Sequence, residues 1–432
     1  MVRDLIEELL LGRYRDPEGG VSIDPIVKSI VIDDDLSGRE AALVADLGFG
    51  DRLAVVSDAI THGVLGRRIE RALGGEFSVQ SVVLGDEPHA DDDTLRRLVA
   101  ELAASTDALV AVGSGTINDL CKAAAGKIGR PYAVFGTAPS MNGYASATAS
   151  ISVDGLKRSF AAGAPRGVFL DVAVLAGAPR RMIRAGLAEG LCRSTAQSDW
   201  LLAHLLVEQS YCEAPFDLLR DDEQALVDRA SGLIAGDFEA VTSLARVLVL
   251  SGIGMTICGS SRSSSQGEHL ISHYIDMTRP EGESAPYHGE QIAVTTLFMA
   301  ELQGRILDRD EPLQVRPSSV GRDQLIARMG TILGEHCWNE YEAKRITAAR
   351  VDHFNERLRA IWGDLRQRIG AVARPAEELR ATLAQVGAAM HPGELGWSDE
   401  RYREACIHSR EIRNRFTFLD LAVDAGVALF HS

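Results

Sequence analysis

Residues 110–122 read VAVGSGTINDLCK, in which an apolar run ends in GSGT and a helical pattern follows at once. Glycines permit a tight turn and let backbone N–H groups approach a pyrophosphate, and the dipole of the following helix favours an anion there. The stretch therefore predicts a strand, a phosphate-holding turn and a helix. The alternative is a plain strand-to-helix turn, with Asn118 and Asp119 as polar residues of the first helical turn.

Short runs rich in β-branched residues surround this stretch, and amphipathic segments such as Leu95–Ala104 lie between them. The predicted strands are Ser29–Asp33, Leu53–Ser57, Gln80–Leu84, Ala108–Val112 and Tyr132–Phe135. Alternating strands and helices predict a parallel sheet with helices on both faces. Residues 151–159 (ISVDGLKRS) predict a hairpin around Asp154-Gly155. We therefore expect an α/β Rossmann-like nucleotide-binding domain over residues 1–175.

The pattern of apolar residues changes after about residue 176, where runs of β-branched residues almost vanish and helical spacing dominates. The predicted helices are Arg180–Glu208, Glu223–Arg246, Gly289–Leu307, Arg345–Gly370 and Pro375–Met390, with Arg309–Arg322 as a polar loop. Residues 176–432 are therefore expected to form an all-α second domain. A cleft between two domains is the default place for a ligand.

Composition narrows the class of protein. A chain of 432 residues favours two domains, and the net charge of −16 argues against a nucleic-acid partner. A few local Arg or Lys side chains and helix N-termini can still hold a small anionic substrate. The six cysteines form no CxxC pair, which indicates reduced thiols and a cytoplasmic location. The N-terminus does not read as a signal peptide, and the longest apolar stretches are expected to be far shorter than the roughly 18 residues of a membrane span.

Asp58 ends the predicted strand LAVVSD. A carboxylate at such a strand tip can accept hydrogen bonds from an adenosine ribose and would repel a 2′-phosphate. The alternative is a helix N-cap formed by Asp58 or Ser57. Here the acid precedes the Gly-rich turn, which reverses the usual dinucleotide fingerprint.

Residues 135–147 (FGTAPSMNGYASA) follow another strand and are rich in small hydroxyl residues. A substrate or a nicotinamide can lie against the backbone of such a loop. Thr137, Ser140, Asn142 and Gly143 are the candidate contacts, and a turn-rich loop without a ligand is the alternative.

Three histidines gather within twenty residues. His269 and His273 share one face of a predicted helix in GEHLISH, and His288 begins another helix in YHGE. Imidazole nitrogen suits Zn²⁺, Fe²⁺ or Ni²⁺, and a catalytic site needs three protein ligands and an open position. Glu189 and Asp199 are candidates for the third ligand, and a surface glutamate is the alternative for Glu189.

Taken in order, these pieces resemble a known family. The segments GSGTINDLCK, TAPSMNGYASATASISVDGLKRS, AGLAEGLCRSTAQSDWLLAHLL, SGIGMTICGSSRSSSQGEHLISH, YHGEQIAV and IHSREIRNRFTFLDLA are similar to bacterial sn-glycerol-1-phosphate dehydrogenases. The resemblance covers roughly residues 25–425 and is specific as a combination, although each motif is weak alone. It implies the dehydroquinate synthase-like fold shared with iron-containing alcohol dehydrogenases: a Rossmann-like domain and a helical metal-binding domain.

The resemblance also implies roles for individual residues. Gly113, Ser114, Gly115, Asn118 and Asp119 would hold the pyrophosphate of NAD or NADP, Asp58 the ribose, and Thr137 and Ser140 would lie near cofactor and substrate. Glu189, His269 and His288 would bind one divalent metal, for which we expect zinc, with nickel or iron as alternatives. His273 would face the substrate pocket.

Two positions depart from the family. Glu189 stands in GLAE where the family usually has Asp in Gly-x-Gly-Asp, and Asn142 replaces an Asp of many relatives. Glutamate at the first position is what dehydroquinate synthase-like members use. The departures put the identity of the substrate in question more than the metal or the cofactor.

The implied activity is the interconversion of dihydroxyacetone phosphate and sn-glycerol 1-phosphate, or of a closely related phosphorylated ketone, by a homodimer or larger homo-oligomer. Lys157 and Arg262 are candidates for the phosphate, with solvated surface residues as the alternative for each. His273 is the candidate for proton delivery. Two other functions stay open: a dehydroquinate synthase-like cyclase with transient NAD redox, and a catalytically idle member of the family.

Overall fold

The computed structural model describes residues 4–430 except 154, 155 and 281. Compactness divides the chain into two units. Unit 1 consists of Met1–Gly190 and Cys212–Ser261, and unit 2 consists of Leu191–Tyr211 and Arg262–Ser432. Because compact units need not be domains, the predicted domain boundary between residues 175 and 176 stays a prediction.

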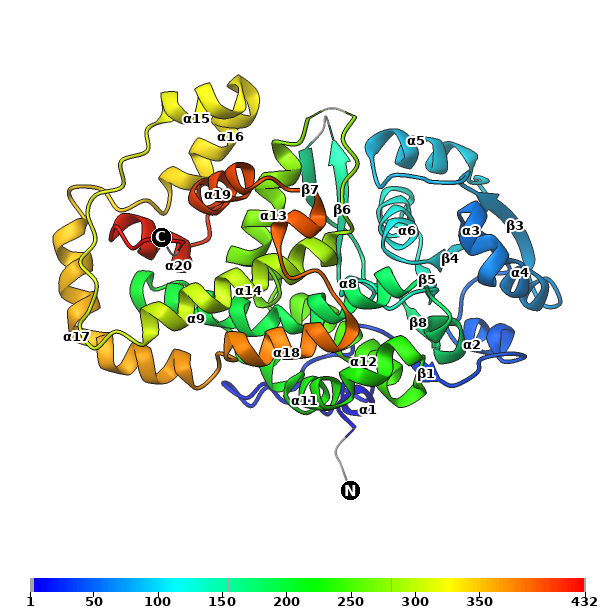
Figure 1. Cartoon of the computed structure of the whole chain (residues 1–432). Helices are drawn as coiled ribbons and strands as arrows, with labels where there is room; N and C mark the ends of the chain where they lie inside the picture. Colours follow the sequence, from blue (N-terminus) through cyan, green and yellow to red (C-terminus); the bar gives the residue numbers. More distant parts are fainter. Residues whose placement is uncertain (1–3, 154–155, 281, 431–432) are drawn as a thin grey trace. The chain divides into compact units, whose positions relative to one another are not determined.

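Unit 1 contains a six-stranded parallel sheet in the order β1-β8-β5-β4-β2-β3 (Figure 1). Its strands are β1 Ser29–Asp33, β2 Arg52–Ser57, β3 Ser78–Val83, β4 Ala108–Gly113, β5 Tyr132–Gly136 and β8 Gly167–Asp171. The five predicted strands and their parallel pairing are confirmed. Sequence analysis missed β8, although it is an inner strand that pairs with both β1 and β5.

Both faces of this sheet are buried. Leu53 and Val55 of β2 pack in one apolar cluster with Val44, Ile69 and Leu73 from neighbouring helices. The residues that alternate with them in β2, Ala54 and Val56, are also fully buried. Since alternate residues of a strand point to opposite faces, helices cover the sheet on both sides, as the apolar runs predicted.

A separate hairpin follows the sheet's fifth strand. β6 (Thr148–Val153) pairs antiparallel with β7 (Leu156–Ala161) in the register that places Ser152 opposite Lys157. The predicted hairpin is confirmed, while its tip, Asp154-Gly155, lies outside the described residues.

The remaining elements of unit 1 are helical. They are α1 Leu5–Leu10, α2 Glu40–Ala45, α3 Ala59–Thr61, the π-helical turn His62–Gly66, α4 Arg67–Leu73, α5 Asp92–Glu101, α6 Gly115–Ile128, α7 Val172–Ala176, α8 Arg180–Leu191, α10 Ala214–Asp217, α11 Arg220–Arg229 and α12 Phe238–Ile257, with a 3₁₀ turn at Ala230–Ala235. The helix predicted over Glu223–Arg246 is thus two helices, because the chain turns through Gly236 at φ 75° and restarts with Asp237 as N-cap.

Helix α12 is the one helix of the described residues that is long and apolar enough to cross a membrane by length and composition, with a mean hydropathy of 1.7 over its best window. The prediction that all apolar stretches are far shorter than a membrane span is therefore wrong for α12. However, 72% of that window is buried inside the protein, as in a core helix.

Unit 2 is built from helices. They are α9 Arg193–Val207, α13 Gly267–Met277, α14 His288–Leu307, α15 Arg322–Met329, α16 Thr331–Glu342, α17 Val351–Gly370, α18 Ala376–Val386, α19 Asp399–His408 and α20 Phe418–Asp424, with 3₁₀ turns at Ser261–Ser263, Pro392–Leu395 and Ser409–Glu411. The predicted helix Arg180–Glu208 breaks at Cys192 into α8 and α9. In the described part of the chain, every regular element after β8 is helical, and the polar loop before α15 is present as predicted.

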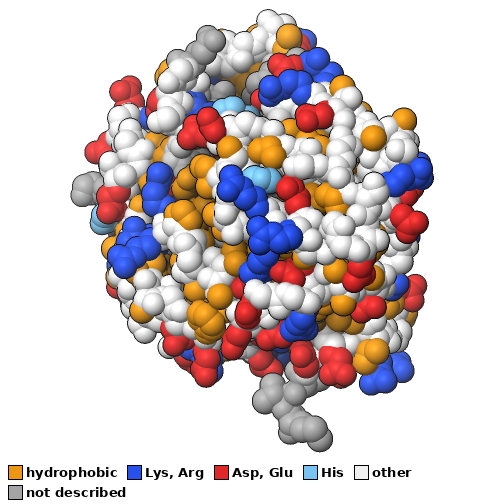
Figure 2. Space-filling model, turned by 90° about the vertical axis from the view of Figure 1, so that its right-hand side faces the viewer, with side chains coloured by type: hydrophobic (Ala, Val, Ile, Leu, Met, Phe, Trp, Pro, Cys, Tyr) orange, Lys and Arg blue, Asp and Glu red, His pale blue; other side chains and the backbone are white. Residues whose placement is uncertain are grey.

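Charge is mixed on the face drawn in Figure 2, where basic side chains lie among acidic ones. The overall excess of acids, 61 Asp and Glu against 45 Lys and Arg, is consistent with this surface.

Candidate functional site

Glu189 is positioned by helix α8. Gly186, one turn earlier, lies so close to the loop after β5 that an added Cβ would be 1.7 Å from the carbonyl oxygen of Pro139. Residues three apart share a helix face, so Glu189 lies on the side of α8 that packs on this loop. Its side chain is buried, at 3% exposure. We call residues 137–147, for which a substrate contact is a prediction, the substrate loop.

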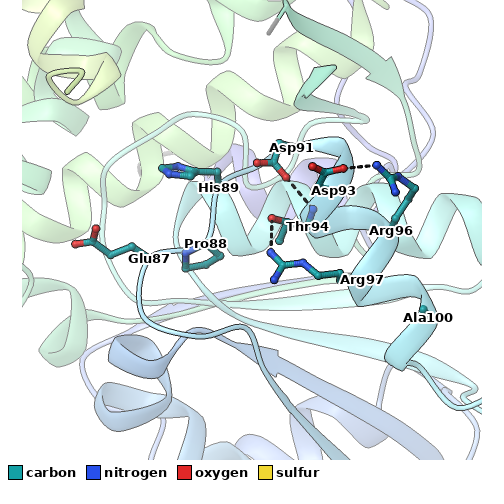
Figure 3. A pocket seen from close by; sticks show the side chains of 9 residues that line it. All are labelled: Glu87, Pro88, His89, Asp91, Asp93, Thr94, Arg96, Arg97 and Ala100. Atoms are coloured by element: carbon teal, nitrogen blue, oxygen red, sulfur yellow. Dashed lines mark hydrogen bonds and ion pairs between the residues drawn. The ribbon is translucent and has the colours of Figure 1, made fainter. Parts of the chain in front are cut away.

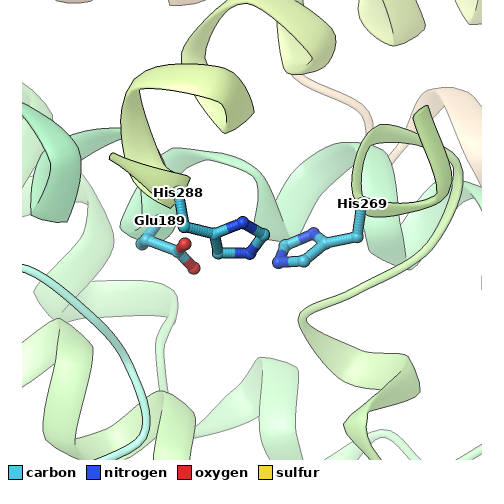
Figure 4. A group of neighbouring side chains, drawn as sticks. All are labelled: Glu189, His269 and His288. Atoms are coloured by element: carbon cyan, nitrogen blue, oxygen red, sulfur yellow. The ribbon is translucent and has the colours of Figure 1, made fainter. Parts of the chain in front are cut away.

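Two histidines meet Glu189. One ligand atom each from Glu189, His269 and His288 lies within 4.8 Å of the other two (Figure 4). His269 comes from α13 and His288 is the first residue of α14. The predicted set of three ligands is therefore brought together, with two imidazoles and one carboxylate in reach of a single ion.

His273 joins the histidine cluster without belonging to that ligand group. Its ring centroid lies 5.8 Å from that of His269 and 5.4 Å from that of His288, and it stacks on the latter at 13°. The three rings therefore form one cluster of imidazoles, in which His273 is one layer removed from the ligand set.

The second nitrogen of each ligand histidine has a partner. Nδ1 of His269 lies 3.0 Å from Oε1 of Glu268, and Nδ1 of His288 lies 3.3 Å from the hydroxyl of Ser272. That hydroxyl in turn donates to Gln291 at 3.0 Å. Such support is typical of metal-binding histidines, and it makes Nε2 the nitrogen we expect to coordinate. The donor set thus fits a divalent transition metal with an open position.

A second group, Cys192, Glu268 and His269, also has ligand atoms within 4.8 Å of one another. Here Glu268 already accepts from the Gln266 amide at 2.7 Å and from the Thr195 hydroxyl at 3.2 Å. All three residues of this group are buried, whereas His288 in the first group is partly exposed. Burial alone would raise the pKa of Glu268, but the hydrogen bond and charge of His269 hold this pKa below its ordinary value. Glu268 is therefore suited to support His269 as a carboxylate.

Asp199, the alternative third ligand, has another task. Its Oδ2 accepts from the amide of Gly267 at 2.9 Å, and its Oδ1 accepts from the amide of Phe418 at 2.8 Å. The carboxylate therefore caps the N-termini of α13 and α20 together. Asp199 is fully buried, which raises its pKa, and neither ligand group includes it.

The predicted nucleotide turn lies at the carboxyl ends of two neighbouring strands. Gly113 ends β4, opposite Gly136 of β5, and the amide of Thr137 donates to the Gly113 carbonyl at 3.1 Å. Ser114 precedes α6, whose first residue is Gly115. Parallel sheets bind ligands at this edge. Gly113, Ser114, Gly115 and Thr137 are thus gathered where a pyrophosphate can meet the α6 N-terminus, and Ser140 follows in the half-buried part of the substrate loop.

Asp58 sits at the end of the adjacent strand β2 and is the N-cap of α3. Its Oδ1 accepts from the Thr61 amide at 2.7 Å, and the Thr61 hydroxyl accepts from the Asp58 amide at 3.1 Å. The N-cap alternative is thus realised. Contact with a ribose through the second oxygen remains a prediction.

Asn118 and Asp119 contact protein groups. The Asn118 amide donates to the Gly143 carbonyl at 3.3 Å, and Asp119 accepts from the amide of Ser150 at 3.1 Å. Both residues thus hold the segment that contains the substrate loop, and their predicted role toward the pyrophosphate stays a prediction. Asn142 belongs to the substrate loop itself, where its carbonyl packs on Gly252 of α12.

Of the two phosphate candidates, Lys157 lies in β7 and its side chain is outside the described residues. Arg262 is half-buried in the turn before α13, where its guanidinium donates to the carbonyl of Asn414 at 3.5 Å. Arg415, which sequence analysis missed, is buried nearby and donates to the carbonyl and the hydroxyl of Ser265. Burial and the charges of Arg413 and Arg262 lower the pKa of Arg415 to about 9. The cluster of arginines in the segment IHSREIRNRF is the sequence feature that could have pointed to Arg415 as a cationic group near Arg262.

One cavity of about 620 Å³ opens at the N-terminus of α5 (Figure 3). Its cations are paired locally, since Arg96 contacts Asp92 and Asp93, and Arg97 donates to the Thr94 hydroxyl. None of the predicted site residues lines it.

Comparison with known proteins gives consistent matches. The family described as iron-containing alcohol dehydrogenase matches residues 31–179. A glycerol-1-phosphate dehydrogenase (NAD(P)+) of Halalkalibacterium halodurans is 33% identical over 256 residues, which cover 58% of this chain and 64% of the relative. A protein of the same name from Pyrococcus furiosus is 32% identical over 277 residues, covering 64% of this chain and 79% of the relative.

Among solved structures, a probable glycerol dehydrogenase from Sinorhizobium meliloti aligns with a TM-score of 0.62 at 18% identity, covering 93% of this chain and 98% of that one. At this identity the match shows the fold alone. It confirms the predicted combination of a Rossmann-like sheet and a helical part.

Proposed function

The chain belongs to the glycerol-1-phosphate dehydrogenase family, and we propose that it interconverts dihydroxyacetone phosphate and sn-glycerol 1-phosphate with NAD(P)H and one divalent metal. The observation that carries the proposal is the convergence of Glu189, His269 and His288, with the δ nitrogens of both histidines supported by protein groups. Members of another class, such as scaffold proteins, have no need for such a supported donor set.

Glu189, His269 and His288 would hold the metal, for which zinc is our prediction. When bound, a divalent cation supplies Lewis acidity that stabilises negative charge on the C2 oxygen as hydride arrives from the nicotinamide. The stacked ring of His273 is suited to move a proton to or from that oxygen, because imidazole titrates near neutral pH. The backbone of Gly113–Gly115 would bind the pyrophosphate, and Asp58 would favour NAD by repelling a 2′-phosphate.

The substrate phosphate needs cationic partners. We assign this role to Arg262, and its neighbour Arg415 adds a second guanidinium to the region. Two guanidinium groups in one region suit an anion, because each presents a fork of N–H donors. A cytoplasmic homo-oligomer stays part of the proposal.

The direct test measures NADH oxidation with dihydroxyacetone phosphate before chelation, after chelation and after zinc is returned. We expect oxidation that stops on chelation and resumes with metal, and one NAD⁺ formed for each substrate reduced. No oxidation with metal restored would overturn the proposal. Turnover of a substrate without net NAD⁺ formation would instead favour the alternative function, a dehydroquinate synthase-like cyclase, which the glutamate at position 189 suggested.

A further inference from the structure

We propose that Lys122 is a positioning residue, which fixes the substrate loop to the helix that begins at the nucleotide turn. The expected effect on turnover rests on the proposed function. In this proposal Lys122 contacts neither the substrate nor the nucleotide, and turnover depends on its side chain while nucleotide binding does not.

The environment of Lys122 is unusual for a lysine. The residue lies in α6 within the apolar sequence LCKAAA and has no solvent exposure. Its Nζ donates to the Gly143 carbonyl at 2.8 Å, to the Ser146 hydroxyl at 3.0 Å and to the Thr148 carbonyl at 2.9 Å. An ammonium group has three donors, so each N–H has one acceptor in the segment that closes the substrate loop.

Stability alone does not account for this arrangement. A buried charge is costly, and an apolar side chain of the same length would cost less to place in the interior. The nearest carboxylate oxygen of Asp119 is 3.7 Å from Nζ, beyond hydrogen-bond distance. The ammonium group therefore donates its hydrogen bonds to backbone and hydroxyl oxygens, and these bonds fix the path of the loop.

Other contacts show what the lysine completes. On the α8 side the loop meets Gly186, and on the α12 side the carbonyl of Asn142 lies where a Cβ on Gly252 would come within 2.7 Å. The Thr256 hydroxyl accepts from the amide of Ala147 at 3.0 Å. Those contacts hold the loop from α8 and α12 by close approach and one hydrogen bond. From α6 the loop is held by Lys122, through three hydrogen bonds, and by Asn118, which donates to the Gly143 carbonyl.

The consequence is a division of labour within unit 1. Helix α6 presents its N-terminus at the nucleotide turn and, two turns later, its ammonium group at the substrate loop. Removing the ammonium leaves the turn at Gly113–Gly115 in place but loosens the loop that carries Ser140 and Asn142. A loss of about 1 Å in positioning can cost roughly 100-fold in rate.

The experiment compares Lys122→Met with Lys127→Met. Lys127 lies on the same helix, is half exposed, and has an ion pair with Asp92 at 3.8 Å. For K122M we expect the dissociation constant for NADH and the metal content to stay within about twofold of wild type, while kcat/KM for dihydroxyacetone phosphate falls by about 100-fold. Hydrogen exchange should accelerate in residues 137–148 and not in β4. K127M should match wild type in every measurement.

A second variant covers the case in which K122M does not fold. Ser146→Ala removes one of the three acceptors and keeps the ammonium, so we expect the same split with a smaller fall, about tenfold. Wild-type kcat/KM in K122M, or in S146A if K122M is unfolded, would overturn the inference. So would an equal fall in nucleotide affinity, metal content and turnover. If the wild-type protein itself does not oxidise NADH with this substrate, the proposed function fails, and hydrogen exchange with the NADH dissociation constant still decides the role of Lys122.

Discussion

At the scale of single residues, the carboxylate beside His269 shows how the ligand set is prepared. Glu268 has no solvent exposure and accepts from the His269 ring, the Gln266 amide and the Thr195 hydroxyl. These contacts fix the ring in one tautomer and one orientation. Glu268, a residue outside the group of Glu189, His269 and His288, thereby determines how His269 presents its other nitrogen.

Glu268→Gln tests this support. The amide keeps the size of the side chain and loses the charge that favours the Nδ1–H of His269, so we expect zinc affinity to fall about 10- to 100-fold. Competition with a chromophoric chelator measures the dissociation constant. Glu404→Gln, at an acid that accepts from the hydroxyl of Tyr274 at 2.9 Å, is the control and should bind zinc as wild type does. Unchanged affinity in E268Q would show that the hydrogen bond does not prepare the site.

Sequence alone could point to the residues that the fold brings together, but not to the groups that support them. His269, His273, His288 and Glu189 stood out because imidazole and carboxylate groups are recognisable by type and spacing. Glu268 and Lys122 did not, since their roles depend on which backbone groups the fold brings within hydrogen-bond distance. Asp199 was a candidate third ligand in the sequence analysis because the sequence does not show its partners. Only the fold shows that two helix N-termini meet at its carboxylate.

At the scale of elements, helix ends and close contacts position the site. Asp199 caps α13, which carries His269 and His273, and α20 at once. Asp199→Ala leaves two buried amide donors without their acceptor, so we expect a loss of about 2–4 kcal/mol in the free energy of unfolding. Urea denaturation measures it. A change below about 0.5 kcal/mol, the usual value for a surface position, would contradict the capping role.

Two glycines of helices give opposite predictions for the same substitution. Gly186→Ala places a methyl group 1.7 Å from the Pro139 carbonyl, whereas a Cβ on Gly363 of α17 meets nothing within 4 Å. We expect G363A to stabilise the protein by about 1 kcal/mol, since alanine is the better helix former. G186A should destabilise it by about 1–3 kcal/mol and reduce turnover, because α8 must move away from the substrate loop. Thermal unfolding and NADH oxidation check both. Similar effects in the two variants would mean that the contact with Pro139 is not tight.

Elements with a strong periodic pattern were predictable, and those defined by context were not. β1 and β4 were found within a residue, because β4 is an apolar run and β1 has the β-branched core Ile30-Val31-Ile32. β8 was missed because GVFLD follows an irregular segment, although its pairing with β1 and β5 makes it an inner strand. The break at Cys192 between α8 and α9 was also missed, since Gly190, the glycine nearest to it, lies inside α8 and the helical spacing runs on through Cys192.

At the scale of the whole molecule, metal binding should add to stability, because an ion that binds only the folded chain shifts the folding equilibrium. At a zinc concentration 100 times the dissociation constant the gain is about 2.7 kcal/mol. We expect the melting temperature of the metal-free protein to rise on addition of zinc in the wild type and not in His288→Ala. An equal rise in both proteins would place the ion elsewhere.

The most direct test of the central claim is anomalous diffraction at the zinc edge from crystals of the zinc-loaded protein. The account predicts one peak, about 2.0–2.2 Å from a carboxylate oxygen of Glu189 and from one nitrogen each of His269 and His288. A peak bound by Cys192 and Glu268, or none at the three predicted ligands, would contradict it.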